Sequence, residues 1–120
     1  MSKMVFIVDD NDVNRFIMTE VLEDQYNVIS LPSAEKMFAK LESVVPDLIL
    51  MDIEMPDMGG FEAIQKLKEN ADYADIPVIF VSSLSSDECE IKCFELGATD
   101  LIARPFNHGV FRCRVNARIK

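Results

Sequence analysis

The sequence has little of what membrane-spanning, secreted and nucleic-acid-binding proteins usually contain. No apolar run approaches the roughly 20 residues of a membrane span. The first apolar run, Met4 to Val8, is too short for a signal peptide and ends in acids. Only 12 basic residues stand against 21 acidic ones, a net charge of −9, which argues against non-specific binding to DNA or anionic membranes. We therefore expect a cytoplasmic protein with no membrane and no direct nucleic acid partner.

Cysteine, histidine and glycine are also scarce. The three cysteines, Cys89, Cys93 and Cys113, are an odd number, which indicates reduced thiols rather than disulfides. Cys89 and Cys93 lie four residues apart, but His108 is the single histidine, so packing or surface positions are favoured over a zinc site. No glycine-rich phosphate loop follows the first apolar run, which argues against a nucleotide-binding protein.

What the sequence does contain is a fivefold alternation of short apolar runs and amphipathic segments. The apolar runs predict strands at Met4–Val8, Asn27–Leu31, Asp47–Met51, Val78–Val81 and Asp100–Ala103. The spacing between them predicts helices from Asp12, from Ser33, from Phe61 to near Asn70, from Asp87 to Leu96 and from Asn107 to Ile119. Such alternation is typical of an α/β fold with a parallel sheet and helices on both faces. We expect one domain over residues 1–120.

Details of four helices can be predicted as well. Asp12 and Ser33 are the expected N-caps of the first two helices. Gly97 is expected to end the fourth helix as its C′ residue. In the last helix, Val110, Phe111, Val115 and Ile119 are expected to face inward, and in the first the apolar spacing is Val13, Phe16, Ile17 and Val21.

Polar side chains follow four of the predicted strands. They are Asp9 and Asp10 after the first, Asp52 after the third, Ser82 and Ser83 after the fourth, and Arg104 after the fifth. Because parallel strands end at one edge of the sheet, these groups can converge there, where open α/β sheets bind ligands. Several carboxylates at one site need a cation, and oxygen-only ligands favour Mg²⁺ or Mn²⁺ over zinc. Such a site suits phosphoryl transfer to a carboxylate.

In order and position these motifs resemble those of the receiver domains of bacterial two-component response regulators, and the resemblance covers nearly the whole chain. It rests on Val8-Asp9-Asp10, the segment Asp52–Gly60, Ser82 at 30 residues after Asp52, Gly97–Asp100, and Arg104-Pro105-Phe106. The resemblance implies a flavodoxin-like, three-layer doubly wound (βα)5 fold with strand order 2-1-3-4-5. It also implies phosphorelay signalling, without catalysis beyond the domain's own aspartyl phosphorylation and dephosphorylation.

The resemblance also implies a role for each matching residue. Asp52 would accept a phosphoryl group from a sensor histidine kinase or a phosphotransfer protein. Asp10, Asp52 and the backbone carbonyl of Glu54 would hold Mg²⁺ (or Mn²⁺), with Asp9 reaching the ion through water. Ser82 would donate a hydrogen bond to the phosphoryl group.

Two positions depart from the family pattern. Arg104 stands where the family normally has a lysine, and it would still stabilise the phosphoryl group. Leu101 stands at the switch position, where the family usually has an aromatic residue that moves inward on activation. An alternative is therefore a non-switching pseudo-receiver that acts only as a protein-interaction module. If the domain does switch, a homodimer through the fourth helix, fifth strand and fifth helix is an expected output.

Other readings of the same residues stay open. Asp9 and Asp10 could form a strand-end turn, and Arg104 could be a surface cation. The run Asp10–Val13 faintly resembles the nucleophile motif of haloacid dehalogenase-type phosphatases, but Asn14 does not fit, the chain is short, and no later acid pair supplies further metal ligands. The basic end of the last helix, Arg112, Arg114, Arg118 and Lys120, either compensates the helix C-terminus or begins a linker to a C-terminal output domain.

Overall fold

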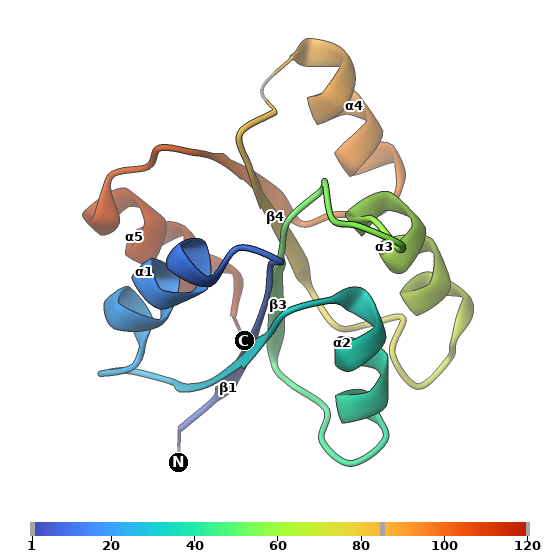
Figure 1. Cartoon of the computed structure of the whole chain (residues 1–120), viewed down its shortest axis with the longest axis horizontal. Helices are drawn as coiled ribbons and strands as arrows, with labels where there is room; N and C mark the ends of the chain where they lie inside the picture. The colour runs from blue at the N-terminus through green and yellow to red at the C-terminus, as the bar shows by residue number, and fades with distance from the viewer. Residues whose placement is uncertain (1, 85, 120) are drawn as a thin grey trace.

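Five parallel strands form one sheet in the order β2-β1-β3-β4-β5 (Figure 1), in a computed structural model that describes residues 2–84 and 86–119. The strands are β1 Met4–Val8, β2 Asn27–Leu31, β3 Leu48–Met51, β4 Val78–Ser82 and β5 Asp100–Ala103. All four neighbouring pairs are parallel. The predicted fold class and strand order are confirmed, and strand bounds differ from prediction by one residue at β3 and β4.

Five helices cover the two faces of the sheet. They are α1 Asp12–Leu22, α2 Ala34–Leu41, α3 Gly60–Glu69, α4 Asp87–Glu95 and α5 His108–Arg118. Figure 1 shows α1 and α5 together on one face and α2, α3 and α4 on the other. Two separate hydrophobic clusters fill these layers. No helix in the described part of the chain is long and apolar enough to span a bilayer.

The central strands are buried on both faces because their side chains alternate between the two clusters. In β3, Leu48 and Leu50 pack in the cluster under α1 and α5. Ile49 and Met51 pack in the cluster under α2, α3 and α4. Full burial of each such side chain contributes about 1.5–3 kcal/mol. A continuous apolar run is what a strand with two covered faces requires.

The helix ends follow local capping chemistry, with one correction to the sequence prediction. Asn11, not Asp12, caps α1: its backbone is extended and its side-chain oxygen accepts from the Asn14 N–H. Asp12 is the first helical residue, where its charge is favourable and where it forms an ion pair with Arg15. Ser33 caps α2 as predicted, accepting from the Lys36 N–H.

The expectation that Val110 faces inward is wrong. Val110 is 49% exposed, whereas Phe111 and Val115 are fully buried and Ile119 is partly buried. The helix packs on the face of the sheet through Phe111 and Val115, and Val110 lies beside these two residues. Gly97 follows α4 with φ of 101°, which confirms it as the residue that ends the helix. Two residues of the sequence interpretation, Lys120 in the basic end and Ser85 in the loop before α4, lie outside the described residues.

Candidate functional site

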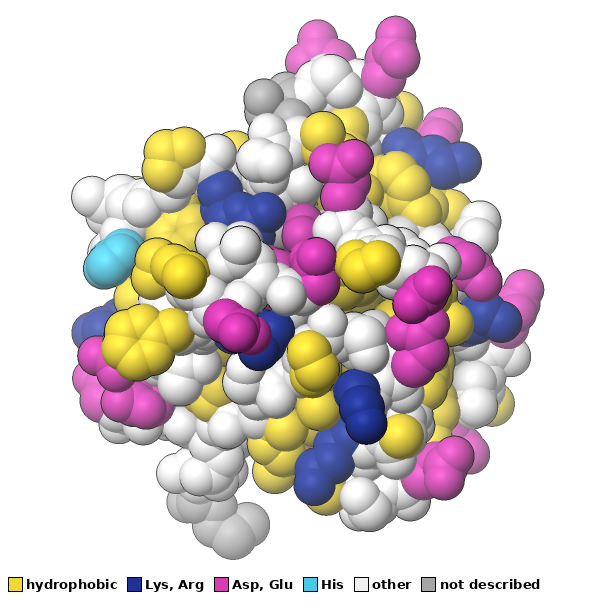
Figure 2. Space-filling model, viewed as in Figure 1, with side chains coloured by type: hydrophobic (Ala, Val, Ile, Leu, Met, Phe, Trp, Pro, Cys, Tyr) yellow, Lys and Arg dark blue, Asp and Glu magenta, His cyan; other side chains and the backbone are white. Residues whose placement is uncertain are grey.

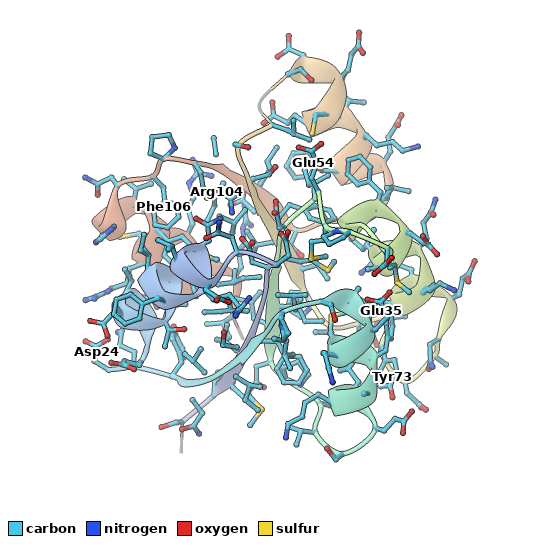
Figure 3. The ribbon with its side chains drawn as sticks, in the orientation of Figure 1. Asp24, Glu35, Glu54, Tyr73, Arg104 and Phe106 are labelled. Carbon is cyan, nitrogen blue, oxygen red and sulfur yellow. The ribbon has the colours of Figure 1, made fainter. Side chains whose placement is uncertain are left out.

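The polar groups that follow β1, β3, β4 and β5 meet at one edge of the sheet, as the sequence predicted. Figure 3 labels Arg104, in the segment after β5, and Glu54, in the loop after β3. Asp9, Asp10 and Asp52 each offer one carboxylate oxygen, and these oxygens lie within 4.8 Å of one another. In Figure 2, acidic side chains lie close to basic ones near the centre of the same face. A strand-end turn does form after β1, because the Asn11 N–H donates to Asp9, and it coexists with this carboxylate cluster. The interpretation of Arg104 as a surface cation is wrong, because its side chain is largely buried and pairs with Asp9.

Asp9 is fully buried, and both of its carboxylate oxygens have partners. Oδ1 accepts a hydrogen bond from the Asn11 N–H at 2.9 Å, and Oδ2 accepts from Nη1 of Arg104 at 2.8 Å. The backbone carbonyl of Asp9 accepts from the Arg15 side chain at 2.6 Å. Asp9 is thus held from three directions at the end of β1.

Asp52 is the buried carboxylate at the end of β3, with 6% of its surface exposed. Its Oδ1 accepts from the Ile53 N–H at 2.8 Å and from Nη2 of Arg104 at 3.4 Å. Burial first, and then the nearby charge of Asp9, raise the pKa of Asp52 to about 6 in spite of the lowering effects of Arg104 and of the Ile53 N–H. The ionised pocket is therefore short of positive charge, as expected where a cation binds.

Ser82 lies at the end of β4 and is almost fully buried. Its Oγ accepts from the Leu84 N–H at 3.1 Å, which leaves its hydroxyl proton available to donate. The carbonyl of Ser82 accepts from the Arg104 N–H at 2.9 Å, so the ends of β4 and β5 are tied together. This bond holds the backbone of Arg104 beside the backbone of Ser82.

The loop after Asp52 depends on close backbone packing at Gly60. A Cβ on Gly60 would lie 2.4 Å from the Asp52 carbonyl oxygen and 2.8 Å from the Phe80 ring. The Gly60 N–H donates to the Ile53 carbonyl at 2.7 Å. Glu54 and Asp57 are exposed on this loop, and Asp57 has a φ of 68°. Because Gly60 has no side chain, α3 can begin directly against the backbone of Asp52.

Two hollows border the site. One, of about 390 Å³, lies between α1 and the segment after β5 and is lined by Asn14, Ile17, Ser83, Arg104, Pro105, Phe106 and His108. A smaller one, of about 140 Å³, is lined by Leu84, Glu90, Leu101 and Ala103. Leu101, the predicted switch position, is partly buried on β5. It lies on the far side of Ser82 from the carboxylates and does not join the acidic pocket.

Sequence reasoning missed three donors that shape the pocket. They are the backbone N–H groups of Asn11 and Ile53 and the side chain of Arg15. Backbone donors carry no residue signal, and Arg15 falls in a helix that the apolar spacing had already explained. Sequence reasoning also did not pair Asp9 with Arg104, which are 95 residues apart.

The carboxylate set fits a hard divalent cation. All candidate ligand atoms are oxygens, and Asp10 is exposed to solvent. Oxygen ligands, partial hydration and an open side are what Mg²⁺ and Mn²⁺ sites require. The three cysteines are elsewhere and free, with Cys93 buried, Cys89 partly buried and Cys113 exposed.

Comparison with known proteins gives one consistent result. The profile of the response regulator receiver domain matches residues 5–116. The chain is 34% identical to the transcriptional regulatory protein YvrH of Bacillus subtilis, over 97% of this chain and 48% of YvrH. It is also 34% identical to a probable cyclic di-GMP phosphodiesterase of Vibrio cholerae, over 97% of this chain and 26% of that protein. It thus spans about half or less of these relatives.

The fold comparison agrees. The structure of the Vibrio cholerae chemotaxis protein CheY4 superimposes with a TM-score of 0.92 at 25% identity, covering 98% of this chain and 99% of CheY4. Sequence profile, curated relatives and fold all point to the same group of signalling modules. The chain belongs to the response regulator receiver domain family.

Proposed function

We propose that this receiver domain accepts a phosphoryl group on Asp52 and passes on a conformational signal. The observation that carries the proposal is the state of the Asp52 carboxylate. One oxygen is held by the Ile53 N–H and by Arg104, while none of the described residues donates a hydrogen bond to the other. That second oxygen is the nucleophile: it forms the new bond to phosphorus as the bond from phosphorus to the donor histidine nitrogen breaks, and the nitrogen keeps the electron pair.

The acidic pocket would hold the divalent cation needed for this reaction. Receiver domains bind divalent metal at an acidic pocket, and here Asp10, Asp52 and the backbone carbonyl of Glu54 are the proposed ligands. Asp9 is proposed to reach the ion through a water molecule. Bound Mg²⁺ or Mn²⁺ would supply charge neutralisation for the phosphoryl oxygens in a site that is already rich in carboxylates.

Ser82 and Arg104 are the proposed donors to the transferred group. The Ser82 hydroxyl is buried and has its proton free, so it can donate to one phosphoryl oxygen. Arg104 already reaches Asp52 and carries a planar, permanently charged fork. Charge-assisted hydrogen bonds of this kind stabilise the charge that spreads over the transferring oxygens.

Receiver domains exchange phosphoryl groups with histidine kinases and phosphotransfer proteins, and α1 is the proposed docking element for such a partner. Val13 and Phe16 on α1 are 63% and 64% exposed, which is unusual for large apolar side chains. Asn14 and Ile17 of the same helix line the larger hollow beside Arg104. A partner that covers this surface would bring its histidine to the edge where the strands end.

The output is proposed to act through α4, β5 and α5, where two copies would form a homodimer. Phe94 and Val110 expose apolar surface on α4 and α5. The first turn of α4 is acidic, and α5 carries Arg114 and Arg118. Because the relatives are longer than this chain, we also propose that residues 1–120 precede a C-terminal output domain in the whole protein.

The test is phosphorylation with acetyl phosphate and Mg²⁺, read by intact-protein mass. The wild type should gain one phosphoryl group that is labile in acid and base, and Asp52→Asn should gain none. Asp57→Asn is the matched control, because Asp57 is exposed on the same loop. Phosphate on serine, or uptake by Asp52→Asn, contradicts the proposal.

A second measurement separates a switching domain from the non-switching alternative. Beryllium fluoride mimics the phosphoryl group, so its binding should change the oligomeric state or the hydrogen-exchange protection of α4. If it binds and changes neither, the domain is a pseudo-receiver that acts as an interaction module.

A further inference from the structure

Helix α4 carries two thiols on the side that packs on the sheet. Cys89 and Cys93 lie four residues apart, so they are neighbours on one face of the helix. Cys93 is fully buried in the hydrophobic cluster under α2, α3 and α4, and Cys89 is partly buried against the same cluster. Of the α4 residues, all of which the structure describes, Cys93 alone is buried. The pair therefore lies at the contact that anchors α4 to the core.

The two thiols interact directly, and the buried one is protonated. Burial first, and then the neighbouring Cys89 thiol through its charge and a side-chain hydrogen bond, raise the pKa of Cys93 to about 12. The charge of Glu90 acts in the same direction, in a first turn that also holds Asp87 and Glu88. Cys93 is thus a neutral thiol at physiological pH. A ligand that leaves a net negative charge on the pair is disfavoured there, because that charge would be buried near other acids.

Ordinary metal chelation does not suit this pair of thiols. A structural zinc ion needs four ligands. No third Cys, His, Asp or Glu in the described part of the chain lies close enough to form a metal-binding group with the two thiols. A cuprous ion accepts two thiolates, but the complex then carries a net negative charge. The pair is therefore suited to a thiophilic group that binds two sulfurs and leaves the product uncharged.

Helical spacing separates the two neutral products that a pair of thiols can form. A disulfide requires the two Cβ atoms to approach to about 3.5–4.5 Å. Cβ atoms of residues four apart on a helix are about 5–6 Å apart, so a disulfide would have to distort α4. An atom that bridges the two sulfurs spans a longer distance and can leave the helix intact. Trivalent arsenic is such an atom, and a monosubstituted arsenical has two positions open for thiols.

We propose that Cys89 and Cys93 form a binding site for trivalent arsenicals, in which one arsenic atom bridges the two sulfurs across one turn of α4. With a monosubstituted arsenic oxide, each S–H bond breaks, two S–As bonds form, and the arsenic oxygen leaves with both hydrogens as water. Arsenic stays trivalent, no electron is transferred, and the product is uncharged. Reaction starts at the partly exposed Cys89 and reaches Cys93 when α4 opens locally. The site does not use Asp52 and does not depend on the proposed phosphoryl chemistry.

The test is reaction with phenylarsine oxide, read by intact-protein mass. The bridged product gains one phenylarsenic group and loses two hydrogens, whereas an adduct on a single thiol keeps the oxygen and is heavier by one water. Cys113→Ala is the reference protein, because it removes the exposed thiol of α5 and keeps the pair. In that background, Cys89→Ala and Cys93→Ala each leave a single thiol.

Retention against a competing monothiol measures the bridge. The reference protein should form the bridged product, keep it in excess glutathione and lose it to a dithiol such as 2,3-dimercaptopropanol. Each single-thiol variant should release the arsenical at a glutathione concentration about 100-fold lower or less, because a second tethered thiol raises affinity by this order. If Cys93→Ala does not fold, Cys89→Ala decides, since Cys89 is only partly buried. Equal retention by Cys89→Ala and the reference protein, or a product that keeps the oxygen, overturns the proposal.

Hydrogen exchange tests whether the bridge forms on an intact helix. A bridge between Cys89 and Cys93 should slow amide exchange in α4 by about tenfold, as expected for a modest local stabilisation. Exchange in α3, which covers the same face of the sheet (Figure 1), should stay unchanged. Faster exchange in α4 would show that bound arsenic unwinds the helix, and it would overturn the proposed bridge across one turn.

Arsenite distinguishes inorganic from organic arsenic as the ligand. When arsenite bridges two thiols it keeps one hydroxyl group, so its product is also recognised by mass. Retention of both compounds by the reference protein supports a site for trivalent arsenic in general. Retention of phenylarsine oxide alone supports a site restricted to monosubstituted arsenicals, and retention of neither overturns the proposal.

Discussion

Helices α3 and α4 cover the same face of the sheet but are attached to it very differently. Four residues of α3 are buried: Gly60, Ala63, Ile64 and Leu67. In α4 only Cys93 is buried, while Ile91 is 57% and Phe94 46% exposed. Elements with few buried apolar contacts open locally at low free-energy cost. The proposed phosphoryl site thus lies beside the firmly packed α3, whereas the neighbouring α4 is held by fewer buried side chains.

The two helices also differ in how they touch the site. The start of α3 packs on the Asp52 backbone through Gly60, so Asp52 and that helix are in direct contact. Helix α4 borders the site through Glu90, which lines the smaller hollow with Leu84, Leu101 and Ala103. Under the proposed function, this arrangement would let α4 shift while Asp52 and α3 stay in contact.

The largest effect should come from truncating the apolar anchor of each helix. Ile64→Ala should lower the free energy of unfolding by about 3.5 kcal/mol, within the usual range for buried Ile→Ala changes. Cys93→Ala should cost only about 1 kcal/mol, because it removes a single buried sulfur. Urea unfolding measures both, with exposed Ile91→Ala as a control expected within about 0.5 kcal/mol of wild type. Equal losses for Ile64→Ala and Cys93→Ala would remove the contrast between the helices.

The next largest effect is expected when a methyl group is added at Gly60. Gly60→Ala would place Cβ against the Asp52 carbonyl and the Phe80 ring, so the backbone must shift. We expect a loss of about 3 kcal/mol, the upper end for overpacking, with slower phosphoryl uptake because Asp52 moves. Gly59→Ala is the control: its Cβ would lie 3.1 Å from one carbonyl, and it should cost less than about 1 kcal/mol. If both variants behave alike, close packing at Gly60 is not what couples α3 to Asp52.

The third prediction concerns how the stability of the metal-free protein depends on pH. The pKa of Asp52 is about 6 in the folded state, above its ordinary value of 3.8, so the ionised group destabilises the fold at neutral pH. This destabilisation begins to lessen as the pH falls through 6, because Asp52 becomes protonated in the folded state. It is gone below the pKa of Asp52 in the unfolded chain, near 4. In EDTA, Asp52→Asn should therefore be more stable than wild type by about 2 kcal/mol at pH 7.5, with the difference vanishing near pH 4. Thermal unfolding across pH measures it, and a gap that widens toward acid would contradict the sign.

The smallest effect on stability is expected at the switch position. Leu101→Tyr can place its ring toward the hollow of about 140 Å³ beside Leu84 and Glu90. Stability should change by less than about 1 kcal/mol, the usual limit for a partly buried position with room beside it. The informative measurement is hydrogen exchange in α4 with and without beryllium fluoride, where the ring should enlarge the difference between the two states. An unchanged difference would show that α4 does not respond through this hollow.

The sequence by itself determined the elements and the chemical kind of the site. Apolar runs such as Leu48–Met51 can be satisfied only by a strand with both faces covered, and alternation with helices then requires a parallel sheet. Parallel strands share one carboxyl edge, which is why Asp9, Asp10, Asp52, Ser82 and Arg104 could be assembled before any coordinates. Local rules likewise predicted Ser33 as a cap and Gly97 as a helix end.

Only the tertiary structure decided how each side chain is used. Spacing predicts that α1 and α5 are helices, but their rotation against the sheet is set by packing, and that left Val13, Phe16 and Val110 exposed. The choice of Asn11 over Asp12 as cap depended on backbone angles where β1 ends. The pairing of Asp9 with Arg104 joins residues 95 positions apart, and it forms because a buried carboxylate must find a partner and the arginine fork is the cation that the fold delivers to it.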